Sequence, residues 1–118
     1  MSGVDGGNMK MRGLGVVAAL GLAAVLSGGW ALAAEVTVIQ KGIAFQPTQI
    51  TVKPGDSVMF VNQDGFGHNV FSESAGGAFD IGLQQPNQRT AVPFRRDGTF
   101  DVLCRIHPKM KLKVTVQN

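Results

Sequence analysis

The sequence predicts an all-β sandwich or barrel for the part of the chain that follows residue 34. Short segments there alternate apolar and polar residues or are apolar throughout, as half-buried and fully buried strands are. Turn-forming residues interrupt these segments about every eight to twelve residues, a spacing typical of all-β sandwiches and barrels. No segment after residue 35 keeps an apolar period of about 3.6 residues, so no amphipathic helix is expected.

The expected strands follow one another with a turn signal at each boundary. Residues 35–40 alternate between apolar and polar side chains, as in a half-buried strand. Residues 57–62 are apolar on both faces, as in a strand at the centre of a sandwich. Proline presets φ and glycine permits positive φ, so Pro54-Gly55-Asp56 is a turn. The stretch from Ser72 to Pro86 contains Gly76-Gly77 and is predicted to be a long loop that crosses between sheets. Strands are expected at residues 35–40, 49–53 and 57–62, from His68 onward, and at 88–94, 99–104 and 112–116.

The N-terminus has the pattern of a secretory signal peptide. Lys10 and Arg12 precede an uncharged stretch, 13–34, which ends in the small-residue site Ala31-Leu32-Ala33. Cleavage is expected after Ala33, which gives a signal peptide at 1–33 and a single domain at 34–118. Met9 or Met11 is an alternative start. The alternative to cleavage is a membrane anchor, because the stretch is long enough to span a bilayer. We expect a periplasmic or otherwise exported protein with no stable membrane insertion after cleavage.

Composition excludes several classes of protein. The 118 residues are 44% hydrophobic and only 16% charged, with a formal charge of +3, unlike a disordered charged tail. The 11 lysines and arginines are spread along the chain, which argues against a nucleic-acid binder. The single cysteine excludes an intramolecular disulfide and any four-cysteine zinc or iron–sulfur site.

One short segment and one upstream residue carry the candidate chemistry. Cys104, His107 and Met110 are three residues apart, between an expected strand end and the last expected strand, and His68 lies upstream. Taken alone, Met110 or Cys104 is more often a core residue and each histidine an ordinary loop residue. Taken together, two histidines, a thiolate and a weak thioether are the ligand set of a blue-copper site. Zinc prefers four strong ligands, and Mg²⁺ and Ca²⁺ prefer oxygen.

These residues resemble those of the cupredoxins, the type 1 (blue) copper proteins, and most closely amicyanin-like and plastocyanin-like members. The resemblance covers residues 35–118 and rests on His68-Asn69-Val70 and on the Cys104, His107 and Met110 loop. It implies a Greek-key β-sandwich or barrel of about seven to eight strands that binds one type 1 copper ion. The implied metal ligands are His68, Cys104, His107 and Met110. Asn69 would tie the two ligand loops together by hydrogen bonds.

The resemblance implies a small exported electron carrier, not an enzyme, that shuttles single electrons by Cu(I)/Cu(II) cycling. Its donor and acceptor would be redox proteins such as a cytochrome c, a dehydrogenase or an oxidase. Ile106 and Phe66 are expected beside His107 in an apolar docking patch. Four basic residues follow in or just after this loop: Arg105, Lys109, Lys111 and Lys113. They either attract an acidic partner over a long range or belong to a solvated edge strand. Lysines on the outer face of strands discourage edge-to-edge association, so a monomer is expected. The alternatives are a copper-delivery protein and a metal-free immunoglobulin-like module.

Overall fold

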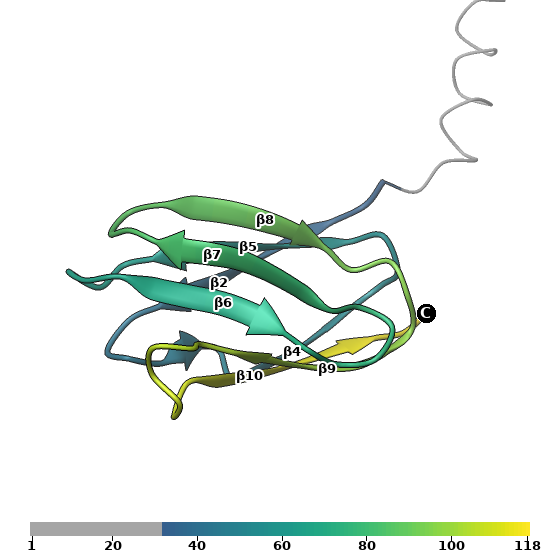
Figure 1. Ribbon diagram of the computed structural model, residues 1–118. Helices are drawn as coiled ribbons and strands as arrows, with labels where there is room; N and C mark the ends of the chain where they lie inside the picture. The colour runs from purple at the N-terminus through teal and green to yellow at the C-terminus, as the bar shows by residue number, and fades with distance from the viewer. Residues whose placement is uncertain (1–31) are drawn as a thin grey trace, which may run out of the picture. The chain divides into compact units, whose positions relative to one another are not determined.

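Two β-sheets pack face to face in the computed structural model of the protein, which describes residues 32–118 (Figure 1). Residues 33–118 form one compact unit, and the described residues contain no helix, so the all-β prediction is confirmed. The first sheet has the order β4 (Gln49–Val52), β10 (Lys111–Val116), β9 (Gly98–Leu103), β6 (His68–Ser72), β7 (Phe79–Gln84). The second has the order β3 (Phe45–Gln46), β2 (Glu35–Gln40), β5 (Ser57–Asn62), β8 (Arg89–Pro93).

Both sheets are mixed, and their facing sides form the core. β10 pairs parallel to β4 and antiparallel to β9, while β2 pairs parallel to β5. Successive side chains of a strand point to opposite faces, so Leu112 and Val114 are buried while Lys111 and Lys113 are exposed. β10 lies between two strands, so the alternative that its lysines mark an edge strand is wrong. The buried set consists mostly of valines and phenylalanines from both sheets.

The predicted loop from Ser72 to Pro86 is wrong in its second half. Residues 79–84 form β7, which pairs antiparallel with β6 in the same sheet, so the chain does not cross between sheets before β7. Alternation of Phe79, Ile81 and Leu83 with polar or small residues was the available signal. It was obscured because Gly82 interrupts the segment and the pair Gly76-Gly77 precedes it, and both are typical of a loop. In the structure Gly82 has a φ of +75°, and the β6–β7 register shifts between Asn69 and Phe71. The two-residue strand β3 was also not predicted, and it brings the number of strands within residues 32–118 to nine, against the seven to eight expected.

The strand directions place all four predicted ligands at one end of the sandwich. One end of the sandwich lies opposite the described N-terminal residues (Figure 1). β6 begins at this end, and β2, β7 and β9 finish there. The predicted signal peptide lies almost wholly outside the described residues, which begin at Leu32. Within residues 32–118, no helix is long and apolar enough to cross a membrane.

Candidate metal centre

The loop between β9 and β10 brings two of the predicted ligands to the start of β6. His68 is the first residue of β6, and Cys104 follows the last residue of β9. The loop then folds back tightly, because the Met110 amide donates to the His107 carbonyl oxygen at 3.0 Å. β6 and β9 are neighbours in the sheet, so the ends of these two strands hold residues 36 positions apart side by side.

Three potential ligand atoms converge at this end. One ring nitrogen of His68, one of His107 and the sulfur of Cys104 all lie within 4.8 Å of one another. The two Nδ1 atoms are 3.1 Å apart, and Cys104 Sγ is 3.8 Å from His107 Nδ1. His68 and Cys104 are buried and His107 is half-buried, so the cluster is shielded by protein on all but one side. Two imidazoles and a thiol in this arrangement suit a transition metal that accepts nitrogen and sulfur together.

Met110, the fourth predicted ligand, lies beside the three residues in the chain and inside the protein. Its side chain is fully buried and belongs to the hydrophobic core, immediately before β10. A buried thioether three residues after His107 is placed by the same tight turn that positions the imidazole. Packing in the core is by itself a sufficient reason for a buried methionine.

Asn69 joins the two ligand-bearing segments, as the resemblance implied. Its backbone amide donates to Cys104 Sγ at 3.3 Å, and its side-chain oxygen accepts from the Arg105 amide at 3.1 Å. Its side-chain nitrogen donates to Asp80 Oδ1 at 2.8 Å and to the Gly82 carbonyl at 3.0 Å. The prediction that Asn69 ties the loops together is confirmed. The Asn69 amide also fixes the position of the Cys104 sulfur relative to the start of β6.

Asp64 holds the far side of the His68 ring. Its Oδ2 is 2.7 Å from His68 Nε2, which leaves Nδ1 to face His107 and Cys104. Burial by itself raises the pKa of Asp64. The hydrogen bond from His68 and those from the amides of Ile43 and Gly42 outweigh this effect, so the pKa lies below its usual range. A carboxylate hydrogen-bonded to the far nitrogen of an imidazole fixes the tautomer and orientation of the ring.

A second aspartate braces the cysteine side of the cluster. The pKa of Asp80 is lowered by hydrogen bonds from the Gly82 amide, from Asn69 and from Arg105. Arg105 Nε lies 3.0 Å from Asp80 Oδ2, and the guanidinium carbon stacks 3.8 Å from the centre of the Phe71 ring. The charge of Arg105 is therefore partly engaged within the molecule, which weakens the prediction that it steers a partner.

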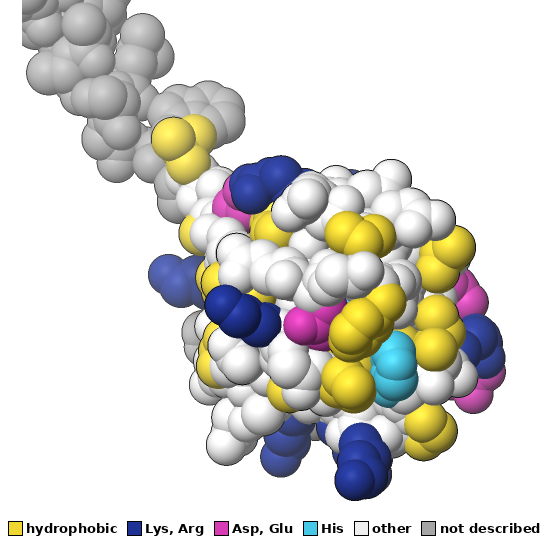
Figure 2. All heavy atoms as spheres, turned by 90° about the vertical axis from the view of Figure 1, so that its left-hand side faces the viewer, with side chains coloured by type: hydrophobic (Ala, Val, Ile, Leu, Met, Phe, Trp, Pro, Cys, Tyr) yellow, Lys and Arg dark blue, Asp and Glu magenta, His cyan; other side chains and the backbone are white. Residues whose placement is uncertain are grey.

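Exposed apolar side chains surround the accessible edge of the cluster. Phe66 packs against both histidines, with ring centroids 5.4 Å from His68 and 5.8 Å from His107, which confirms the expected neighbour. Figure 2, which faces this end, shows the exposed histidine bordered by hydrophobic side chains. A shallow hollow beside His107 is lined by Ile43, Ile106, Pro108 and Lys109. The large apolar residues Ile43, Phe66, Leu83 and Ile106 are 44% to 59% accessible, and Leu83 lies against Gly67, which precedes His68.

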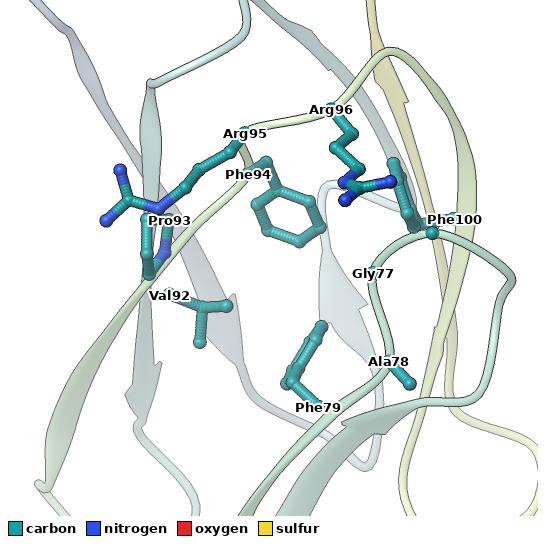
Figure 3. A pocket seen from close by; sticks show the side chains of 10 residues that line it. Gly77, Ala78, Phe79, Val92, Pro93, Phe94, Arg95, Arg96 and Phe100 are labelled. Atoms are coloured by element: carbon teal, nitrogen blue, oxygen red, sulfur yellow. The ribbon is translucent and has the colours of Figure 1, made fainter.

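The opposite end of the sandwich has a pocket lined by aromatic side chains. It encloses about 330 Å³ between the β6–β7 and β8–β9 connections. Phe79, Phe94 and Phe100 line its interior, and Arg95 and Arg96 lie at its mouth (Figure 3). Adjacent rings pack edge to face with centroids 5.8 and 5.6 Å apart. Its lining contains no histidine, cysteine or carboxylate, so it offers no metal ligands.

Residues 32–117 match the family model described as copper binding proteins, plastocyanin/azurin family. The chain belongs to this family. The match spans both sheets and the whole ligand cluster. Copper is therefore the metal that the family binds, and the His68, Cys104 and His107 donors fit one type 1 copper ion.

Individual relatives agree with this family membership. The chain is 34% identical over 76 residues to "Amicyanin-alpha" of Methylorubrum extorquens, a match that covers 62% of this chain and 64% of that protein. The solved structure of a reduced amicyanin variant has a TM-score of 0.65 and 27% identity, and the match covers 70% of this chain and 82% of the other. A copper-containing nitrite reductase from Thermus scotoductus SA-01 has a TM-score of 0.66 and 27% identity. That match covers 75% of this chain but only 23% of the reductase.

Sequence reasoning found the candidate donors of this cupredoxin but missed the residues that hold them. Asp64 precedes His68 by four positions in a loop, and an acidic residue there was a signal that could have been noticed. Asp80 lay inside the segment taken for a loop. Ile43 carried no signal, because its place beside His107 depends on how β2 and β3 are joined.

Proposed function

We propose that this protein is a type 1 copper electron carrier with His68, Cys104, His107 and Met110 as ligands. The observation that carries the proposal is the convergence of two imidazole nitrogens and the only cysteine sulfur within 4.8 Å. Family membership supports copper as the metal, and the amicyanin relative supports electron transfer as the task. A copper ion bound here supplies one-electron chemistry, since it alternates between one and two positive charges.

The protein's own contribution is to hold the donors still. His68 is fixed from behind by Asp64, and Cys104 receives the Asn69 amide. Both are buried between strands of a packed sandwich, so their positions change little when the charge at the centre changes. Three strong donors and one thioether also leave no open position for a substrate, which a catalytic metal site would keep. We therefore expect no enzymatic turnover by this domain.

Electrons would enter and leave through the half-buried edge of His107. It is the most accessible member of the cluster. Ile43 and Ile106 line the hollow beside it, and Phe66 packs against its ring. The exposed Leu83 lies against Gly67, the residue before His68. Figure 2 shows hydrophobic side chains gathered around the histidine at this end. We call Ile43, Phe66, Leu83, Ile106 and His107 the docking face. An apolar face of this kind excludes water and lets a partner's redox group approach closely, while its small size permits rapid release. Lys109 at the rim adds a positive charge that favours an acidic partner.

The partners in this proposal are redox proteins, one donor and one acceptor, such as a cytochrome c, a dehydrogenase or an oxidase. The predicted signal peptide at 1–33 places the mature protein in the periplasm or elsewhere outside the cytoplasm. We expect it to act as a monomer. A transient docking face does not require a second copy of the chain.

The test is to add one equivalent of Cu(II) to the purified protein and record visible and electron paramagnetic resonance spectra before and after ascorbate. An intense thiolate-to-copper absorption with narrow copper hyperfine splitting, bleached by ascorbate and restored by ferricyanide, is the expected result. A colourless protein that binds Cu(I) tightly would instead indicate copper delivery. Absence of copper binding would leave only a structural β domain.

Substitutions then assign the ligands one by one. His68→Ala and Cys104→Ser are expected to abolish the blue absorption. Met110→Gln is expected to keep the copper and lower the reduction potential, because an amide oxygen is a harder ligand than a thioether. Met59→Gln in β5 is the matched control and should leave spectrum and potential unchanged. Identical spectra and potentials for Met110→Gln and the wild type would remove Met110 from the ligand set.

A further inference from the structure

The turn between β2 and β3 contains a residue in an unfavourable backbone conformation. Gly42 and Ile43 have φ values of +65° and +56°, in the left-handed region. Glycine occupies this region freely, but for a β-branched residue such as isoleucine it is a rare and costly conformation. Backbone strain of this kind persists only where neighbouring groups enforce it, and it is concentrated at functional sites.

The strained residue belongs to the docking face. The Ile43 side chain is 44% exposed, and it lines the hollow beside His107 together with Ile106. An isoleucine whose apolar side chain faces solvent contributes little to the core, so core packing does not account for the strain. The conformation instead presents an apolar side chain next to the exposed edge of the metal centre.

The group that enforces this conformation is the carboxylate of Asp64. Its Oδ1 accepts from the Gly42 amide at 2.7 Å, and its Oδ2 accepts from the Ile43 amide at 3.1 Å. Oδ2 also accepts from His68 Nε2 at 2.7 Å. Three N–H groups thus share one carboxylate, which has enough lone pairs for all of them.

Asp64 is itself held in place. Its side chain is only 10% exposed, and its amide donates to Asn62 Oδ1 at 2.9 Å. Asn62 is fully buried, with its side-chain nitrogen bound to the Phe66 and Gln84 carbonyl oxygens. The carboxylate is therefore a fixed bridge between the His68 ring on one side and the Gly42–Ile43 turn on the other.

We propose that Asp64 is a positioning residue that couples the His68 ring to the Gly42–Ile43 turn, so that the metal centre and the docking face respond to each other. The inference rests on the proposed function, since it takes His68 as a copper ligand and Ile43 as a contact for the redox partner. A metal ion bound at His68 Nδ1 would hold the imidazole ring in place. The ring would then hold the Asp64 carboxylate through Nε2, and the carboxylate would hold the Gly42 and Ile43 amides. Coupling between two sites is reciprocal, so a partner that holds Ile43 in place also favours the liganded position of His68.

The test uses the full chain and follows the amide hydrogen exchange of Gly42 and Ile43 by NMR. In the metal-free protein, Asp64→Asn is expected to speed exchange at both amides by about tenfold or more, because an asparagine has one acceptor oxygen for three N–H groups. Asp97→Asn, an exposed aspartate near the other end of the sandwich, is the matched control and should leave both rates unchanged. Unchanged exchange in Asp64→Asn would overturn the bridge.

A measurement on the wild type tests the coupling without any substitution. Binding of diamagnetic Cu(I) is expected to slow exchange at Gly42 and Ile43, and Asp64→Asn should lose this effect. Asp64→Asn should also raise the reduction potential, because loss of the carboxylate makes the imidazole a weaker donor and favours Cu(I). A wild type that binds Cu(I) with no change at these two amides would refute the coupling. A wild type that never turns blue would refute the proposed function, while the metal-free comparison would still decide whether the bridge exists.

Discussion

Replacement of Asn69 by alanine should separate the stability of the fold from the formation of the metal centre. The substitution removes three side-chain hydrogen bonds, to Asp80, to the Gly82 carbonyl and from the Arg105 amide. It leaves the backbone amide that donates to Cys104 Sγ. The variant should therefore be less stable while it still forms a copper–thiolate bond.

The expected loss follows from the kinds of bond removed. Two of the bonds are between neutral groups and contribute about 1 kcal/mol each, and the bond to the Asp80 carboxylate contributes about 1.5 to 3 kcal/mol. Asp80 and Arg105 are 41% and 52% exposed, so water replaces part of what they lose. We expect the free energy of unfolding to fall by about 2 to 4 kcal/mol. In a domain of this size that corresponds to a Tm lower by at least about 8 °C.

The assay is urea unfolding of the reduced, metal-free protein, followed by circular dichroism. Asn118→Ala is the matched control, because Asn118 is exposed at the C-terminus. The visible spectrum of each copper-loaded variant is then recorded. Surface substitutions usually change the free energy of unfolding by less than about 0.5 kcal/mol. A decrease no larger than this for Asn69→Ala would show that its three side-chain hydrogen bonds make no net contribution to stability. Loss of the blue absorption in a folded Asn69→Ala protein would show that the backbone amide is not sufficient.

Three further outcomes can be measured by unfolding experiments. Gly77→Ala should cost about 1 to 3 kcal/mol, because a Cβ there would lie 2.4 Å from the Phe100 ring, whereas Gly65→Ala meets no atom within 4 Å and should be nearly neutral. The pKa of Asp56 is lowered by the Ala34 and Lys53 amides, so its stabilising effect is complete above about pH 4 and is lost as the pH falls through the lowered value. Unfolding of metal-free Asp56→Asn between pH 5 and pH 2 should accordingly show a weaker pH dependence than that of the wild type, and an equal dependence would contradict this assignment. Copper at about one hundred times its Kd should stabilise the protein by about 2.7 kcal/mol, a shift in Tm that a chelator reverses; no shift would mean that the folded state does not bind copper preferentially.

Strand alternation made most of the fold predictable from sequence. β2 and β10 show this alternation along their length, whereas β5 is recognisable as a continuous apolar run. The ends of all three strands agree with the prediction to within one residue. β7 was missed because its alternation includes Gly82 and because it follows a glycine pair, both of which resemble a loop. β3 is too short for any periodicity, and it forms a strand only because β2 offers it a partner.

The sequence by itself determined the all-β class and the chemistry of the candidate donors, because both depend on residue types at short spacings. Cys104, His107 and Met110 were found in this way, and His68 was found because it is the only other histidine. Only the tertiary structure decided that β10 is internal, that Asp64 and Asp80 support the two sides of the centre, and that Ile43 reaches the docking face. The contacts of Asp64 with Ile43 and of Asn69 with Arg105 join residues 21 and 36 positions apart. The strand order and loop conformations that create such contacts are set by the packing of the whole sandwich.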